Sequence, residues 1–186
     1  MSMRVIWGLV LSLVAGSAVA DEFLWEKLRR DPNMIVLMRN SESSGNQDGA
    51  NMFIWDASGE CQGESNLTAK GKAQAKRIGK AFAERGVRPT VISSPMCRCR
   101  ETAELAFGRH FTHPDLRLQS ATGEVFQERA TALLRQHRGR KPVVFVNHRP
   151  NINSLTMELI NIGELLVGSI NEDGEIEVLG KIRGDP

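Results

Sequence analysis

The strongest buried-strand pattern in the chain is Pro142-Val143-Val144-Phe145-Val146. A second apolar run, Met34-Ile35-Val36-Leu37-Met38, is also continuous, which is typical of a strand that is covered on both faces. Val91-Ile92 predicts a third, shorter strand, and the apolar spacing over residues 68–86 predicts a helix between the second run and this strand. Because strands alternate with helices, we expect an α/β three-layer sandwich, in which a mostly parallel central sheet has helices on both faces.

The other segments extend this alternation. Three more helices are expected, over residues 97–107, 126–134 and 150–162. Residues 165–179 predict a closing hairpin, because two apolar runs flank the turn signal Asp173-Gly174. Residues 40–66 are rich in Ser, Gly, Asn and Asp and predict a long loop, a kind of segment that is often functional.

The composition is that of an ordinary globular domain. The chain has 186 residues, of which 41% are hydrophobic and 25% charged, and these values exclude a disordered or coiled-coil protein. A formal net charge of +2 provides no basic stripe of the kind that nucleic-acid binders use, so no nucleic-acid partner is expected. The Cys and His residues show no zinc-type spacing, and we expect no metal.

The first 20 residues have the pattern of a secretory signal peptide. Arg4 provides a positive start, residues 5–15 form a short apolar stretch, and Ala18-Val19-Ala20 is an A-x-A cleavage signal. The apolar stretch is shorter than the about 20 residues that span a bilayer, although an uncleaved N-terminal anchor is the alternative. We therefore expect a mature single domain over residues 21–186, without a membrane span, in an oxidising periplasmic or secreted location.

The three cysteines are an odd set, so one thiol remains when one intramolecular disulfide forms. A bond between Cys97 and Cys99 would close a very short loop, and residues two apart on a helix point in different directions. Cys61 with Cys97 is therefore the favoured pair, with Cys99 as a small buried apolar side chain. A nucleophilic or redox role for Cys97 or Cys99 is the alternative.

Three basic residues follow predicted strands. Arg39 comes directly after the first strand, Arg98 lies in the first turn of the helix after Val91-Ile92, and His148 follows the Val143–Val146 strand. Ligands of such sheets bind beyond the carboxyl ends of the strands, and free N–H groups at a helix start favour an anion there. Two guanidinium groups and an imidazole suit a phosphate, so these residues predict a phosphate pocket.

Taken singly, each of these residues is more simply a solvated cation or a structural histidine. Arg100 and Arg149 lie next to the set in the sequence. We interpret both as helix-surface charges or as partners of the residues that contact the ligand.

Four motifs occur in order along the chain: Arg39-Asn40 after a buried strand, Leu67-Thr68-x-x-Gly71-x-x-Gln74-Ala75, Ser93-Ser94-Pro95-x-Cys97-Arg98-x-x-x-Thr102-Ala103, and Val146-x-His148-x-x-Asn151-Ile152. Together they resemble the histidine phosphatase superfamily, which has the phosphoglycerate-mutase-like fold. The resemblance runs from about Ile35 to Leu179, and the leader with the Cys61/Cys97 pair resembles a small exported, periplasmic branch.

The resemblance implies roles for individual residues. In the family, the histidine of an Arg-His motif attacks phosphorus, while two arginines and a later histidine hold the phosphoryl oxygens. Carried over, Arg39, Arg98 and His148 hold phosphate, and Asn40 occupies the position of the nucleophile. A carboxamide nitrogen is not a nucleophile, because its lone pair is delocalised into the carbonyl, but it still donates hydrogen bonds. The resemblance implies no cofactor.

A carboxylic acid that protonates the leaving group is also expected for unactivated esters. Glu124 is our first candidate, with Glu42 and Glu128 as alternatives, whereas Glu101 points away from Arg98 in a regular helix. His110 and His113 are interpreted as surface loop residues.

Three hypotheses follow. The first is a pseudophosphatase that binds a phosphorylated small molecule but is catalytically impaired, because Asn40 replaces the phosphoryl-accepting histidine. The second is an active periplasmic phosphomonoesterase that uses an unconventional route, for example on a phosphorylated envelope sugar. The third is an interaction protein that keeps only the scaffold.

Overall fold

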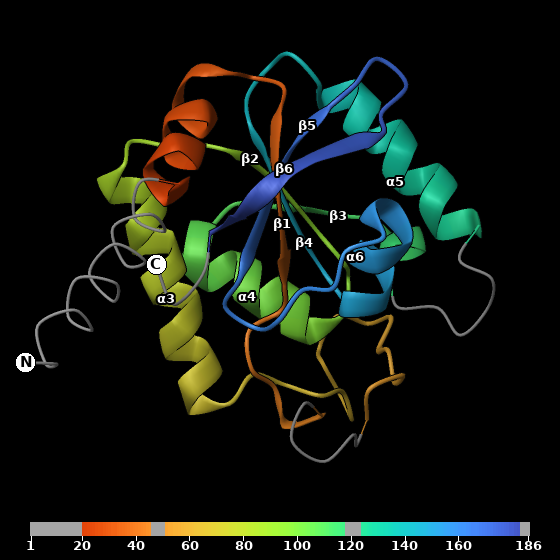
Figure 1. The fold of residues 1–186 in the computed structure, drawn as a ribbon. Helices are drawn as coiled ribbons and strands as arrows, with labels where there is room; N and C mark the ends of the chain where they lie inside the picture. Colours follow the sequence, from red (N-terminus) through yellow and green to blue (C-terminus); the bar gives the residue numbers. More distant parts are fainter. Residues whose placement is uncertain (1–19, 46–50, 118–123, 183–186) are drawn as a thin grey trace, which may run out of the picture.

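The computed structural model describes residues 20–45, 51–117 and 124–182 (Figure 1). Six strands form one sheet: β1 (Met34–Arg39), β2 (Thr90–Ser93), β3 (Phe111–Thr112), β4 (Val143–Asn147), β5 (Leu165–Ile170) and β6 (Ile176–Ile182). Their order in the sheet is β3-β2-β4-β1-β5-β6. The first four positions in this order are parallel, and β5 and β6 add an antiparallel hairpin beside β1. The prediction of an α/β fold with a mostly parallel central sheet is confirmed.

Helices cover both faces of this sheet (Figure 1). The described helices are α3 (Ala69–Glu84), α4 (Cys97–Phe107), α5 (Glu124–His137), α6 (Arg149–Thr156), a short 3-10 helix η1 (Pro114–Leu116) and a helical segment over residues 20–30. One core cluster joins alternate strand residues to α3, α4 and the N-terminal helical segment, and a second joins the other strand residues to α5, α6 and η1. The two clusters give the three layers of the sandwich.

Two local expectations differ from the structure. The helix expected over 150–162 ends at Thr156, because Met157 takes a left-handed conformation (φ 59°) and its N–H donates to the Asn153 carbonyl at 2.7 Å. As a result Leu159, within the expected helix, lies outside α6 and is 69% exposed. The helical segment over residues 20–30, which buries Trp25 against the core, was not predicted from the sequence.

The predicted signal peptide, residues 1–20, lies outside the described residues apart from Ala20. Within residues 20–45, 51–117 and 124–182, no helix combines the length and apolar character that a membrane crossing requires.

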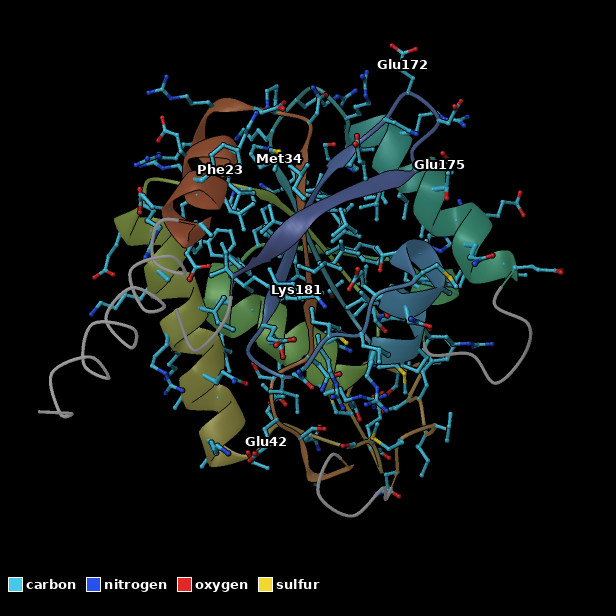
Figure 2. All side chains as sticks on the ribbon, viewed as in Figure 1. Phe23, Met34, Glu42, Glu172, Glu175 and Lys181 are labelled. Atoms are coloured by element: carbon cyan, nitrogen blue, oxygen red, sulfur yellow. A yellow bond between two sulfur atoms is a disulfide. The ribbon has the colours of Figure 1, made fainter. Side chains whose placement is uncertain are left out.

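The loop after β1 is fixed against the start of α3. Thr68 caps α3 by accepting a hydrogen bond from the Gly71 N–H at 3.0 Å, and the Thr68 N–H donates to the Glu42 carbonyl. A Cβ at Gly71 would lie 2.0 Å from that same carbonyl, so only glycine permits this approach. Figure 2 shows Glu42 beside the N-terminal end of α3. The backbone that follows Arg39 is therefore held in one place.

Candidate functional site

The carboxyl ends of three parallel strands are aligned by backbone pairing. Arg39, the last residue of β1, is in register with Asn147 of β4, and the Asn40 N–H donates to the Asn147 carbonyl at 3.1 Å. On the other side of β4, the Ser94 N–H donates to the Val146 carbonyl at 3.0 Å. The segments that carry Asn40, Ser94 and the residue after β4 therefore leave the sheet at one edge, as parallel pairing requires.

Arg98 is the most unusual of the predicted site residues. It lies in the first turn of α4, and its side chain is completely buried. Nη2 donates to the Met52 carbonyl at 2.9 Å and contacts the Met96 sulfur at 3.7 Å, but Nε and Nη1 have no hydrogen-bond partner among the described residues. Burial lowers the pKa of this guanidinium, partly offset by the nearby Glu64 carboxylate. Buried donors without a partner are costly, so this arrangement favours an anionic ligand.

His148 lies beside Arg98 and Ser94. The imidazole is buried, its Nε2 is 2.9 Å from the Ser94 hydroxyl oxygen, and the Cys99 sulfur lies 3.7 Å from Nδ1. The pKa of His148 is well below its usual value, chiefly because the ring is desolvated and then because Arg98 and Arg39 repel its protonated form. The ring is therefore neutral near pH 7 and is able to donate one hydrogen bond and accept another.

Arg39 completes what we call the basic cluster, namely Arg39, Arg98 and His148. Its side chain is half-buried. Burial lowers the pKa of Arg39 first, followed by repulsion from Arg149 and from Arg98. The structure places these three sequence-predicted basic residues at the carboxyl ends of the neighbouring parallel strands β1, β2 and β4, with the exposed Arg149 directly after His148. An anion between them would add attractive interactions that offset these repulsions.

Asn40 is buried next to this cluster, with 1% of its surface exposed. Its amide Nδ2 donates to the Ser41 carbonyl at 2.9 Å. The Ser41 N–H in turn donates to the Thr102 hydroxyl at 3.0 Å, and that hydroxyl donates to the Arg98 carbonyl at 2.6 Å. Thr102 thus connects the segment that carries Asn40 to the helical turn that carries Arg98. The Asn40 amide therefore has a fixed location, and its nitrogen lone pair is delocalised into the carbonyl.

The start of α4 differs from the expectation of free N–H groups for a ligand. Glu64, which is 5% exposed, accepts a hydrogen bond from the Cys97 N–H at 2.8 Å through Oε2. Its other oxygen accepts from the Asp56 N–H at 2.8 Å. The protein's own carboxylate therefore occupies part of this positive helix end. Glu64 was not predicted as a site residue, because its partner is 33 residues away in the chain and no motif connects the two.

The candidate acids are placed differently from one another. Glu42 is bonded to the Thr68 hydroxyl at 2.9 Å and to Lys70 at 3.0 Å. Glu101 accepts a hydrogen bond from the Leu67 N–H at 2.9 Å, so its carboxylate holds the backbone of the loop before α3. Glu124, the first residue of α5, is exposed, and so is Glu128. The assignment of Glu124 as the acid stays a prediction.

The two loop histidines have local partners. His110 Nδ1 lies 3.1 Å from the Gly108 carbonyl and 3.4 Å from Glu104. His113 Nδ1 accepts from the Asp115 N–H at 3.2 Å. These contacts fit the interpretation of both as loop residues.

The cysteines divide into one pair and one thiol. Cys61 and Cys97 form a disulfide, with their Cα atoms 5.7 Å apart. Cys99 is a free, buried thiol whose pKa is raised to about 12, because desolvation opposes the thiolate. A thiol that stays protonated is a poor nucleophile. Within the described parts of the chain, no cluster of three His, Cys, Asp or Glu side chains has the arrangement of a metal site.

The aromatic side chains of the loop after β1 lie outside the two core clusters. Phe53 is 71% exposed. The Trp55 ring is partly buried and stacks on the Arg117 guanidinium, 4.8 Å from the ring centroid. Met52 contributes its backbone carbonyl to Arg98.

Residues 35–119 match the family described as the histidine phosphatase superfamily (branch 1). No curated protein matches the sequence. The fold is similar to that of the protein TTHB049 from Thermus thermophilus, with a TM-score of 0.59 and 22% sequence identity over 80% of this chain and 98% of that chain.

Two further solved structures are similar. A mutant of phosphoserine phosphatase from Entamoeba histolytica, in complex with phosphoserine, has a TM-score of 0.57 and 17% identity over 80% of this chain and 95% of that one. The protein histidine phosphatase SixA, complexed with tungstate, has a TM-score of 0.57 and 15% identity over the same shares. At these identities the similarity shows a common fold.

Proposed function

We propose that this chain, which carries a histidine phosphatase superfamily domain, binds phosphate monoesters through Arg39, Arg98 and His148 without the covalent step of the family. The observation that carries the proposal is the buried Arg98 guanidinium, whose Nε and Nη1 lack partners among the described residues. A phosphoryl group supplies the acceptors that these donors lack, and it supplies the negative charge that the basic cluster lacks.

The step that is lost is nucleophilic attack. A neutral imidazole at position 40 would attack phosphorus with a nitrogen lone pair, the phosphorus–oxygen bond to the alcohol would break, and a phosphohistidine would form. The Asn40 amide has no such lone pair, and its Nδ2 already donates to the Ser41 carbonyl. His148 has a neutral ring, but its Nε2 is engaged with Ser94. The chain is therefore proposed to be a pseudophosphatase, in which Asn40 keeps a polar contact with the bound group.

The class of ligand is supported by two proteins of similar fold. The phosphoserine phosphatase mutant is described with phosphoserine, a phosphate monoester, and SixA with tungstate, a tetrahedral oxyanion. A phosphorylated small molecule is accordingly our proposed partner, and the pocket residues are those carried over from the family resemblance.

We also propose that the protein works in the periplasm or outside the cell, after cleavage behind Ala20. The A-x-A pattern before Asp21 supports export, and the Cys61–Cys97 disulfide fits an oxidising compartment.

Calorimetric titration of the purified chain with inorganic phosphate or vanadate tests the function, with sodium chloride at equal ionic strength as the control for screening. The expected result is saturable binding together with no measurable hydrolysis of 4-nitrophenyl phosphate. Binding with steady turnover would instead support an unconventional phosphomonoesterase. The absence of saturable binding would contradict the proposal and leave the scaffold hypothesis.

A further inference from the structure

The loop segment over residues 51–66, which we call the clasp, crosses the start of α4 and is covalently attached to it. The disulfide joins Cys61 in the clasp to Cys97, the first residue of α4. The clasp residue Glu64 accepts from the N–H of that same cysteine at 2.8 Å. A covalent bond and a buried charge-assisted hydrogen bond therefore converge on the residue that precedes Arg98.

The clasp also contacts two arginine side chains of α4. The Met52 carbonyl accepts from Arg98 Nη2 at 2.9 Å. The Gly59 carbonyl accepts from Arg100 Nη2 at 2.9 Å. Both arginines are thus oriented by backbone carbonyls of one segment. For Arg98, this contact holds Nη2 and leaves Nε and Nη1 for a ligand.

Internal hydrogen bonds keep the clasp in one shape. Asp56 accepts from the N–H groups of Ser58 and Gln62, each at 2.9 Å, and these bonds lower the pKa of its carboxyl. The Asp56 N–H donates to Glu64 at 2.8 Å. The carbonyl of Met52 and the carboxylate of Glu64 therefore belong to a locally ordered loop, whose attachment to α4 depends on few contacts.

We propose that the clasp positions Arg98 for anion binding and that the Cys61–Cys97 disulfide keeps it closed, so that reduction weakens anion binding. The inference rests on the proposed function, because the anion is the phosphate of that site. A dithiol reductant supplies the two electrons and two protons: one of its thiolates attacks the Cys61 or Cys97 sulfur, the sulfur–sulfur bond breaks, and the reductant ends as a disulfide while both cysteines become thiols.

The neighbouring thiol does not compete in this reaction. Cys99 is completely buried and stays protonated, with a pKa of about 12, so it is not an attacking thiolate. Cys61 is partly exposed and Cys97 is buried, so a solvent reductant reaches the disulfide from the clasp side. Opening and closing of this bond is then a reversible two-state change, without exchange among the three cysteines.

The test compares the affinity for inorganic phosphate before and after treatment with dithiothreitol. We expect reduction to weaken binding about tenfold, the scale of one hydrogen bond to a charged group. Cys61→Ser is the matched control: its affinity should equal that of the reduced wild type and should not respond to dithiothreitol. Equal affinity of oxidised and reduced protein would overturn the inference and leave the proposed function intact. No phosphate binding by the oxidised protein would overturn both.

A thermodynamic cycle shows whether reduction weakens phosphate binding through the position of Arg98 or through a general loss of order in the site. In Arg39→Ala, reduction should still weaken phosphate binding about tenfold, whereas in Arg98→Ala reduction should change it less than about twofold. An equal loss in both variants would contradict a role through Arg98.

Circular dichroism shows whether the reduced protein stays folded. Where it does not, Glu64→Ala with the disulfide intact replaces reduction, because it releases the Cys97 N–H and the Asp56 N–H from the carboxylate without breaking the covalent bond. Weaker phosphate binding in this variant supports the clasp, and unchanged binding overturns it.

Discussion

The carboxyl end of β1 and the first turn of α4 each contribute one arginine to the basic cluster, but the two regions are built differently. At β1, Arg39 is half-buried, and the residue after it, Asn40, donates its amide to a backbone carbonyl. At α4, Arg98 is completely buried, held on one nitrogen by Met52 and left without partners among the described residues on the other two. In the α4 region, a charged guanidinium is buried with two nitrogens that lack hydrogen-bond partners among the described residues. In the β1 region, the buried Asn40 amide donates a hydrogen bond within the protein.

Under the proposed function, this difference assigns anion binding to the α4 region and the missing phosphoryl transfer to the β1 region. A buried guanidinium with unpaired donors is unfavourable unless an anion completes it, so the α4 region is organised for binding. The amide at position 40 provides no nucleophilic nitrogen, so the proposal assigns no covalent catalysis to the β1 region. Four experiments address this contrast, from the largest expected effect to the smallest.

Asn40→His should restore the chemistry of the β1 region. We expect hydrolysis of 4-nitrophenyl phosphate to rise by about 10³-fold or more over the wild type, because a nucleophile contributes several orders of magnitude to turnover. Asn40→Gln is the control. It lengthens the side chain by one methylene but keeps an amide without a nucleophilic nitrogen, so it should stay inactive. If Asn40→His binds phosphate and gains no activity, more than the nucleophile is missing.

Arg98→Ala should strongly weaken anion binding by the α4 region. Removing a buried charged partner of an anion costs about 2–4 kcal/mol, or roughly 30-fold to 1,000-fold in the dissociation constant for phosphate measured by calorimetry. Lys80→Ala, which removes an exposed charge paired with Glu84 on α3, should change the affinity little. An Arg98→Ala protein with wild-type affinity would place the anion elsewhere.

Thr102→Val should remove the hydroxyl that joins the segment after β1 to the first turn of α4. The variant keeps the shape of the side chain but leaves the buried Ser41 N–H without its acceptor, at a cost of about 1–3 kcal/mol in the free energy of unfolding. Urea denaturation measures this loss, and Thr102→Ser, which retains the hydroxyl, should recover most of the stability. A Thr102→Val protein as stable as the wild type would show that the contact between the two regions contributes nothing.

The pH dependence of stability should be the smallest effect. Because the pKa of His148 is lower in the folded protein than in the unfolded chain, the unfolded chain binds its proton first as the pH falls. The contribution of the buried neutral ring to the free energy of unfolding is therefore fully present above about pH 6.5. As the pH falls below that value, the contribution decreases by at most about 1.4 kcal/mol per pH unit. Denaturation at pH 7.0 and pH 5.5 should therefore show a smaller loss in His148→Gln than in the wild type, and an equal loss would contradict a buried neutral ring.

The regular elements were predictable because each has a local cause. The continuous apolar runs of β1 and β4 reflect burial on both faces, and α4 begins at Cys97 and ends before Gly108, as its sequence pattern indicates. The early end of α6 was not predictable, since the left-handed residue that terminates it is a methionine rather than a glycine. The helical segment over residues 20–30 was not predicted, since it begins at the A-x-A pattern that ends the expected leader.

Within the candidate site, the alternation of strands and helices was sufficient to predict that Arg39, Arg98 and His148 follow parallel strands of one sheet, and these strands are neighbours. The partners of Arg98 were not predictable. Met52 and Glu64 lie in a loop without apolar periodicity, and their contacts with α4 join residues 46 and 33 positions apart. Such contacts depend on how the loop folds back, which no local pattern specifies.

The most direct measurement is a crystal structure of the unaltered protein with tungstate, whose heavy atom is located without ambiguity. The account predicts one tetrahedral anion within hydrogen-bond distance of Nε or Nη1 of Arg98, with Arg39 and His148 around it and no covalent bond to position 40. A structure in which both Arg98 nitrogens stay without an anion at saturating tungstate would contradict the account.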